Sequence, residues 1–171
     1  MDQAYCDALR FAMEYERKGE EHYRSAAAAA KDHFAKQALT FLADEEIEHI
    51  RKIDEFNQHM LGIGDFDIDA ECQLGLSSRV EDFLETAKGA TSEEDRRLTE
   101  IDVYDQAMEN EKHGYEMYAS VETGTQNESL KQFFAFLAQE EKAHYNLLEA
   151  SKKYLQDPSY YFEEGGGWLF G

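Results

Sequence analysis

Two copies of the motif Glu-x-x-His stand at a fixed separation in this chain. The stretch FLADEEIEH contains Glu46 and His49, and the later stretch FLAQEEKAH contains Glu141 and His144. Residues three apart on a helix share a face, so each pair presents a carboxylate and an imidazole together. Carboxylate and imidazole groups are ligands for iron and manganese. The two stretches therefore indicate a metal site built from two similar halves.

An internal duplication contains both motifs. Without a gap, residues 10–53 match residues 105–148 at 16 of 44 positions, where average residue usage gives roughly three by chance. The repeat also preserves Glu16 and Glu111, each 30 residues before the glutamate of the motif in its own half. Repeated segments of a chain commonly form similar structural units that pack against one another. The chemistry should therefore lie where the two halves meet.

A pair of helical hairpins would bring the outlying glutamates to the motifs. Because a helix rises about 1.5 Å per residue, a tight turn halfway between Glu16 and Glu46 puts them at about the same height. The same holds for Glu111 and Glu141. Four carboxylates in a low-dielectric core repel one another and take up protons unless cations balance them. A pair of metal ions resolves this conflict, and oxygen-rich ligation with one imidazole per metal suits iron, with manganese as the alternative.

Helical periodicity supplies the elements that position these residues. Apolar residues at helical spacing predict four long helices, at about residues 2–30, 33–60, from between 94 and 99 to 123, and 128–155. Asp32 and Asn127 are expected to cap the second and fourth helices. Gly124 should close the third helix, and Asp157-Pro158 should end the fourth.

The long connection between the two halves decides the topology. Residues 61–98 form a Gly- and Asp-rich crossover, within which 79–88 reads as a short amphipathic helix. Two antiparallel hairpins joined by one long crossover describe an all-α, ferritin-like four-helix bundle. The expected domain covers residues 1–157. The tail, 158–171, is expected to fold back on its own domain or on a dimer mate, the alternative being a docking peptide for a partner protein.

Composition narrows the classes of partner and location. The formal net charge of −20 repels nucleic acid and anionic membranes and attracts cations, so neither of those two partners is expected. The two cysteines, Cys6 and Cys72, form no CxxC pair and indicate no disulfide framework. No signal peptide is apparent, and no stretch approaches the length of a membrane span. A cytoplasmic location is therefore expected.

These residues resemble the rubrerythrin-type di-iron domain of the rubrerythrin/ferritin-like superfamily over about residues 1–156. In that family the first-helix ligand lies seven residues before a tyrosine on the same face. Tyr23 stands in that relation to Glu16, and Tyr118 stands in it to Glu111. The resemblance implies that both tyrosines are hydrogen-bond donors that orient ligand carboxylates. Glu46 and Glu141 would be the bridging carboxylates. The implied metal ligands are Glu16, Glu46, His49, Glu111, Glu141 and His144.

Two departures from the family pattern bear on function. Rubrerythrins usually carry a rubredoxin domain with a four-thiolate iron site, which two cysteines cannot build within this chain. They also have an extra glutamate three residues after the third-helix ligand, and Gly114 occupies that position here. This argues against a peroxidase cycle that depends on this glutamate, but not against di-iron binding.

Three functions from different classes follow from these patterns. The leading hypothesis is a di-iron oxidoreductase that reduces H2O2 or O2, with a separate rubredoxin or flavoprotein as electron donor. The alternative is a ferroxidase that stores or handles iron. A third interpretation is a helical interaction module without catalytic activity. The resemblance also implies a homodimer.

Two further repeated pairs adjoin the expected ligands. Glu45 and Glu140 lie about 100° around the helix from the bridging glutamates, and we expect them to face solvent or to lie at the rim of the site. Gly19 and Gly114 weaken a helix interior. Their recurrence indicates close packing or, alternatively, room for a small molecule beside the metals.

Overall fold

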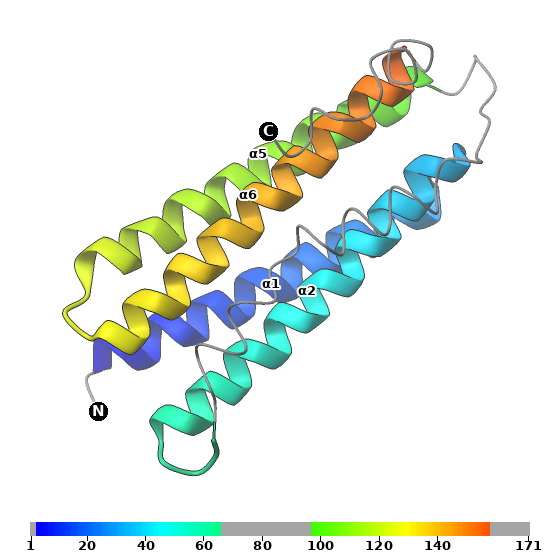
Figure 1. Cartoon of the computed structure of the whole chain (residues 1–171). Coiled ribbons are helices and arrows are strands. Elements are labelled where there is room, and N and C mark those ends of the chain that lie inside the picture. Colours follow the sequence, from blue (N-terminus) through cyan, green and yellow to red (C-terminus); the bar gives the residue numbers. More distant parts are fainter. Residues whose placement is uncertain (1–2, 66–96, 158–171) are drawn as a thin grey trace.

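The computed structural model describes residues 3–65 and 97–157, and within these ranges it contains four helices and no strand. The helices are α1 (Gln3–Ala29), α2 (His33–Met60), α5 (Arg97–Gly124) and α6 (Glu128–Gln156). Helix α1 packs along α2, and α5 packs along α6, so the chain forms two antiparallel hairpins (Figure 1). The predicted all-α four-helix bundle is confirmed. Most of the predicted crossover, with its short helix, and the tail lie outside the described residues.

The helix boundaries follow the local signals in the sequence. The Asp32 carboxylate accepts a hydrogen bond from the backbone N–H of Ala35 at 2.9 Å, and the Asn127 side chain accepts one from Leu130 at 3.0 Å. These caps satisfy N–H groups that the first helical turn leaves without an intrahelical partner. Helix α5 ends at Gly124, as predicted. Within the described residues, no helix is long and apolar enough to cross a membrane.

Two apolar clusters fill the bundle, one toward each end. In the first, Phe34 of α2 packs against Tyr154 of α6, with ring centroids 4.5 Å apart. In the second, Phe56 of α2 stacks on Phe133 of α6, with centroids 4.1 Å apart and ring planes 9° from parallel. Burying such aromatic pairs is a main source of stability in a helical core. The bundle is thus held together on both sides of its middle.

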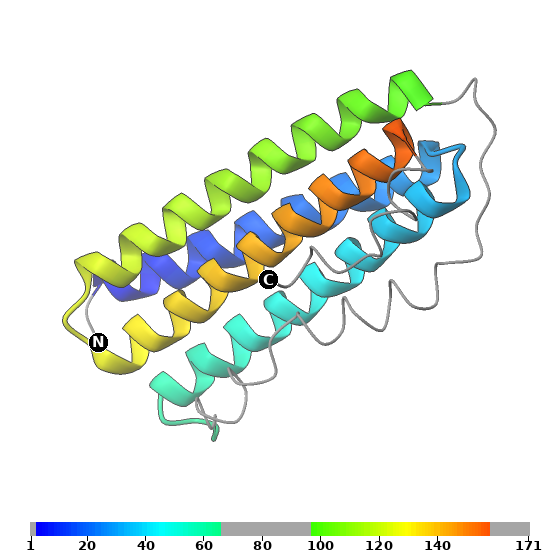
Figure 2. The same cartoon turned by 45° about the horizontal axis from the view of Figure 1, so that its top comes forward.

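The middle of the bundle contains a layer of charged side chains. The hairpins meet there through α2 against α6 and α1 against α5, as Figure 2 shows from a second direction. Six ionisable side chains in this layer are at most 3% exposed: Glu16, Glu46, His49, Glu111, Glu141 and His144. Charged groups are almost never buried so fully unless they are paired or bind a metal. The fold therefore concentrates its chemistry at this level.

Candidate metal centre

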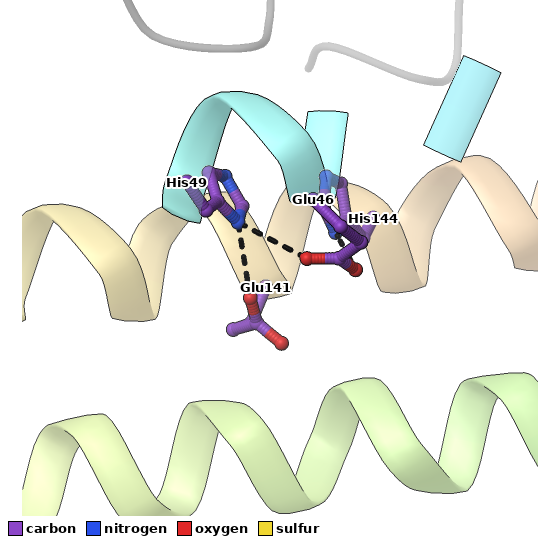
Figure 3. Close-up of side chains that lie close together, drawn as sticks. All are labelled: Glu46, His49, Glu141 and His144. Carbon is purple, nitrogen blue, oxygen red and sulfur yellow. Dashed lines mark ion pairs between the residues drawn. The ribbon is translucent and has the colours of Figure 1, made fainter. Parts of the chain in front are cut away.

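Helices α2 and α6 provide the four candidate ligands that lie closest together. Each of Glu46, His49, Glu141 and His144 offers one ligand atom, and these atoms all lie within 4.8 Å of one another. The His49 Nδ1 atom lies 3.3 Å from Glu46 Oε2 and 3.8 Å from Glu141 Oε1. The His144 Nδ1 atom lies 3.5 Å from Glu46 Oε1. Figure 3 shows these side chains converging from the two helices.

Helices α1 and α5 complete the centre from the other side. Glu16 Oε2 lies 3.4 Å from His49 Nδ1, and Glu111 Oε2 lies 3.3 Å from His144 Nδ1. Each outer glutamate therefore approaches the histidine of its own hairpin. The two imidazole rings stack with centroids 5.1 Å apart. The structure thus brings together all six residues that the sequence pattern selected.

The carboxylate oxygens and ring nitrogens of this cluster are better placed to bind metal ions than to form hydrogen bonds with one another. Among the described residues, no hydrogen-bond partner is found for Glu46 Oε2, Glu111 Oε2, Glu141 Oε1 or either ring nitrogen of His144. Leaving a buried polar atom unsatisfied costs about 1–3 kcal/mol. Two atoms that each lie about 2.1 Å from one ion are themselves roughly 3.0–3.4 Å apart. The observed spacings are close to that range, so the residues present fit a pair of metal ions.

Without metal, the cluster holds protons. Burial raises the pKa of Glu16 to about 8, and the neighbouring charge of Glu46 adds to the effect. Burial, followed by the charge of Glu111, raises the pKa of Glu141 well above its usual range. Burial acts to lower the pKa of His144, but the charges of Glu111 and Glu46 outweigh it and raise the value to about 10. Metal ions must displace these protons in order to bind.

Two buried tyrosines connect the hairpins at this level. The Tyr23 hydroxyl of α1 donates a hydrogen bond to Glu111 Oε1 of α5. The Tyr118 hydroxyl of α5 donates one to Glu16 Oε1 of α1. Each tyrosine therefore fixes the carboxylate of the opposite hairpin, which the spacing within one half did not indicate. Oriented carboxylates of this kind bind metal more tightly.

Removing one of these hydroxyl groups should weaken metal binding without unfolding the bundle. In Tyr118→Phe the ring still fills its place in the core, but Glu16 loses the donor that orients it. Losing such a partner typically costs 10–100-fold in metal affinity, roughly. Titration of the metal-free protein with Co(II) measures the effect. Tyr115→Phe, at a 39% exposed position of the same helix, is the control, and equal affinities in the two variants would contradict the orienting role.

The two repeated glycines make room for the central carboxylates. A Cβ atom added at Gly19 would lie 3.2 Å from Glu46 Oε1. One added at Gly114 would lie 3.0 Å from Glu141 Cδ and 2.9 Å from Tyr15 Cε1. Contacts this short force a neighbour to move. The recurrence of glycine thus reflects close packing, one of the two explanations that the sequence left open, with a carboxylate as the packed group.

We expected Glu45 and Glu140 to face solvent or to lie at the rim of the site, and of these two expectations solvent exposure was wrong. Both are buried, at 7% and 3% exposure. Glu140 Oε2 of α6 lies 3.8 Å from His49 Nε2 of α2, on the ring nitrogen that faces away from the other carboxylates. The contact between α2 and α6 is wide enough to include positions 100° away from the central glutamates. Their recurrence directly beside the expected ligands was the signal for this role, since a metal-bound histidine commonly donates its second N–H to a carboxylate.

Comparison with known proteins agrees with this geometry. A family model described as Rubrerythrin matches residues 7–152. Among solved structures, the chain is similar to a hypothetical protein from Pyrococcus furiosus, with 22% sequence identity and a TM-score of 0.64, covering 91% of this chain and 92% of that one. At this level of identity the likeness concerns the fold. No curated protein matches the chain.

Proposed function

Because the chain belongs to the rubrerythrin family, we propose that it is a di-iron oxidoreductase that reduces hydrogen peroxide or dioxygen. The observation that carries the proposal is the buried cluster of glutamates and histidines at the middle of the bundle. Burying such a cluster, in which several carboxylate oxygens and ring nitrogens lack a hydrogen-bond partner, costs free energy if its role is only structural. It is the ligand set that di-iron and di-manganese bundles use.

In this proposal each hairpin holds one ion. Glu16 and His49 would hold the first ion, Glu111 and His144 would hold the second, and Glu46 and Glu141 would be shared between the two. When bound, two Fe(II) ions supply one electron each, and hydrogen peroxide takes these two electrons with two protons to give two molecules of water.

The protein's own residues hold and shield this chemistry. The hydroxyls of Tyr23 and Tyr118 keep the outer carboxylates oriented, while Glu140 Oε2 lies 3.8 Å from His49 Nε2 on the other side of the ring. The apolar clusters close the layer of ligands off from the two ends of the bundle. The electrons for the next turnover come from a separate donor, a rubredoxin or a flavoprotein, and the protein acts as a homodimer; both points are part of the proposal.

Metal analysis of the protein purified without oxygen tests this proposal. We expect two irons per chain, oxidised stoichiometrically by hydrogen peroxide, and none in the variant Glu46→Ala/Glu141→Ala, because both bridging carboxylates are then missing. Two manganese ions instead would keep the site and change the chemistry. No metal in either protein, with both folded, would contradict the di-metal site.

The same preparation separates the proposal from the other two functions. Repeated turnover of peroxide with a chemical reductant at constant bound iron is the behaviour of an oxidoreductase. A ferroxidase that stores iron would instead consume added Fe(II) and form mineral. An interaction module would retain its activity in the cell when the bridging glutamates are replaced.

A further inference from the structure

The two halves of the duplication differ at a position beside the metal centre. Tyr15 of α1 corresponds to Asn110 of α5 through the offset of 95 residues. The Tyr15 ring meets Tyr118 edge to face, with centroids 6.2 Å apart and planes at 77°. It also lies directly against Gly114, and its hydroxyl donates a hydrogen bond to the backbone carbonyl of Asn110 at 2.5 Å. Tyr15 thus fills the space between α1 and α5 on the Gly114 side.

On the Gly19 side the same space is open. A cavity of about 180 Å³ lies there between α1 and α5. The exposed residues Lys18 and Asn110 line this cavity together with the ring of Tyr15 and the buried carboxylates of Glu46, Glu111 and Glu141. A cavity that begins at solvent and ends on the candidate ligands is a path to the metals.

The size of the cavity limits what can use it. Sites for drug-sized organic ligands measure roughly 300–1,000 Å³, whereas a water molecule occupies about 30 Å³ in the liquid. A volume of 180 Å³ therefore admits a molecule of a few heavy atoms, together with some water. A drug-sized organic substrate or the prosthetic group of an electron donor does not fit.

The charge of the residues that line the cavity favours the entry of a neutral molecule. Four ionised carboxylates balance the charge of two divalent ions, so the loaded centre with neutral histidines carries no net charge. An anion that enters this buried space loses its hydration, and a centre without net charge offers no net attraction to offset that cost. Hydrogen peroxide and dioxygen are both small and uncharged.

We propose that a small neutral oxidant reaches the metal centre through the cavity beside Gly19 and Asn110, and that Tyr15 closes the equivalent path beside Gly114. This inference rests on the proposed function, since it assumes a metal centre in the cluster. It adds an entrance on one side only, determined by one substitution between the two halves.

Exchanging the two residues tests the proposal. Asn110→Tyr places a ring in the cavity, and the probe is nitric oxide, a small neutral molecule whose binding to the di-Fe(II) protein is followed by stopped-flow absorbance. We expect the association rate to fall at least tenfold. Binding of two Co(II) ions per chain shows that the centre itself is intact. Glu109→Tyr, which adds the same ring at the neighbouring exposed position outside the cavity, should keep the wild-type rate.

The double variant Tyr15→Asn/Asn110→Tyr separates a closed path from general damage. It moves the ring from the position beside Gly114, where it also lines the present cavity, to the position beside Gly19, so we expect it to recover most of the wild-type rate. Should Asn110→Tyr fail to fold, Asn110→Leu adds less bulk and should slow binding by a smaller factor. An unchanged rate in a folded variant at Asn110 that holds two Co(II) ions would overturn the path alone. A wild-type protein that binds no metal would overturn the proposed function and the path together.

Discussion

Replacing Gly114 by alanine should weaken metal binding by about 10–100-fold, the cost typical of displacing a group that positions a ligand. The added Cβ would lie 3.0 Å from Glu141 Cδ and 2.9 Å from Tyr15 Cε1. Neither neighbour can move freely, because the Tyr15 ring is packed against Tyr118 and the Glu141 carboxylate lies within the buried cluster. The bridging carboxylate must therefore leave the position in which it meets its partners.

The helix itself should not suffer from this change. Alanine is more favourable than glycine in a helix interior by about 0.5–1 kcal/mol, so part of the steric cost is offset. We expect far-ultraviolet circular dichroism to show an unchanged helix content, while titration with Co(II) shows the loss of affinity. The combination of retained fold and weakened binding distinguishes a displaced ligand from unfolding.

Two other glycines provide graded controls. Gly19→Ala brings a Cβ to 3.2 Å from Glu46 Oε1, a milder contact, and should weaken binding less than Gly114→Ala. A Cβ at Gly124 meets nothing within 4 Å, and Gly124→Ala should bind metal as the wild type does. An equal affinity in all three variants would show that the glycines do not determine where the central carboxylates lie.

The metal-free protein should lose stability as the pH rises from about 4.5 to about 10. The pKa of Glu16 is 4.5 in the unfolded chain and about 8 in the fold, so the folded state binds more protons between these values. The free energy of unfolding then falls with rising pH, by up to about 1.4 kcal/mol per pH unit for each such group. The raised pKa of Glu141 acts in the same direction.

The histidines extend this window upward. The folded pKa of His144 is about 10, against 6.5 in the unfolded chain. Its contribution to stability is fully present below pH 6.5 and is lost as the pH rises through about 10. The pKa of His49 is also raised well above its usual range, by the charge of Glu16 against the opposing effect of burial. Glu16, Glu141 and the two histidines, whose pKa values are all raised, therefore make the empty cluster less stable as they lose protons.

Urea unfolding at several pH values between 5 and 9 measures this effect. A concentration of about 0.5 M salt reduces the contribution of the surface charge, because the Debye length is then well below 10 Å. We expect Glu16→Gln to flatten the decline and Glu14→Gln, at an exposed position of the same helix, to follow the wild type. Saturating metal should remove the decline, since bound cations replace the protons. Stability that increases over this range in the metal-free protein would contradict the buried, protonated cluster.

Local signals and the duplication were enough to predict the elements and the cluster. Asp32 and Asn127 cap α2 and α6 as their positions indicated, because capping depends on only a few neighbouring residues. The six buried ionisable residues could be selected from one chain because they recur at one offset with helical spacing. A single Glu-x-x-His motif in an acidic helix would not have been enough.

Features that depend on how the hairpins dock could not be predicted in this way. The burial of Glu45 and Glu140 follows from the width of the contact between α2 and α6, which the period of a single helix does not contain. The hydrogen bond from Tyr23 to Glu111 crosses between hairpins, whereas the sequence spacing relates residues within one. The group packed against Gly114 was likewise visible only once the opposite helices were placed.

The pairing of Tyr15 with Asn110 has a consequence for the origin of the fold. Each hairpin contributes the same set of residues: one outer glutamate, one Glu-x-x-His motif, one tyrosine and one glycine. Two identical hairpins related by a twofold axis would therefore form the same centre. In such a symmetric dimer every residue occurs twice, so the two equivalent paths to the metal centre would be both open or both closed. Joining the copies in one chain allowed each to accumulate its own substitutions. A centre with one closed side and one open side therefore requires two hairpins of different sequence, which the single chain provides.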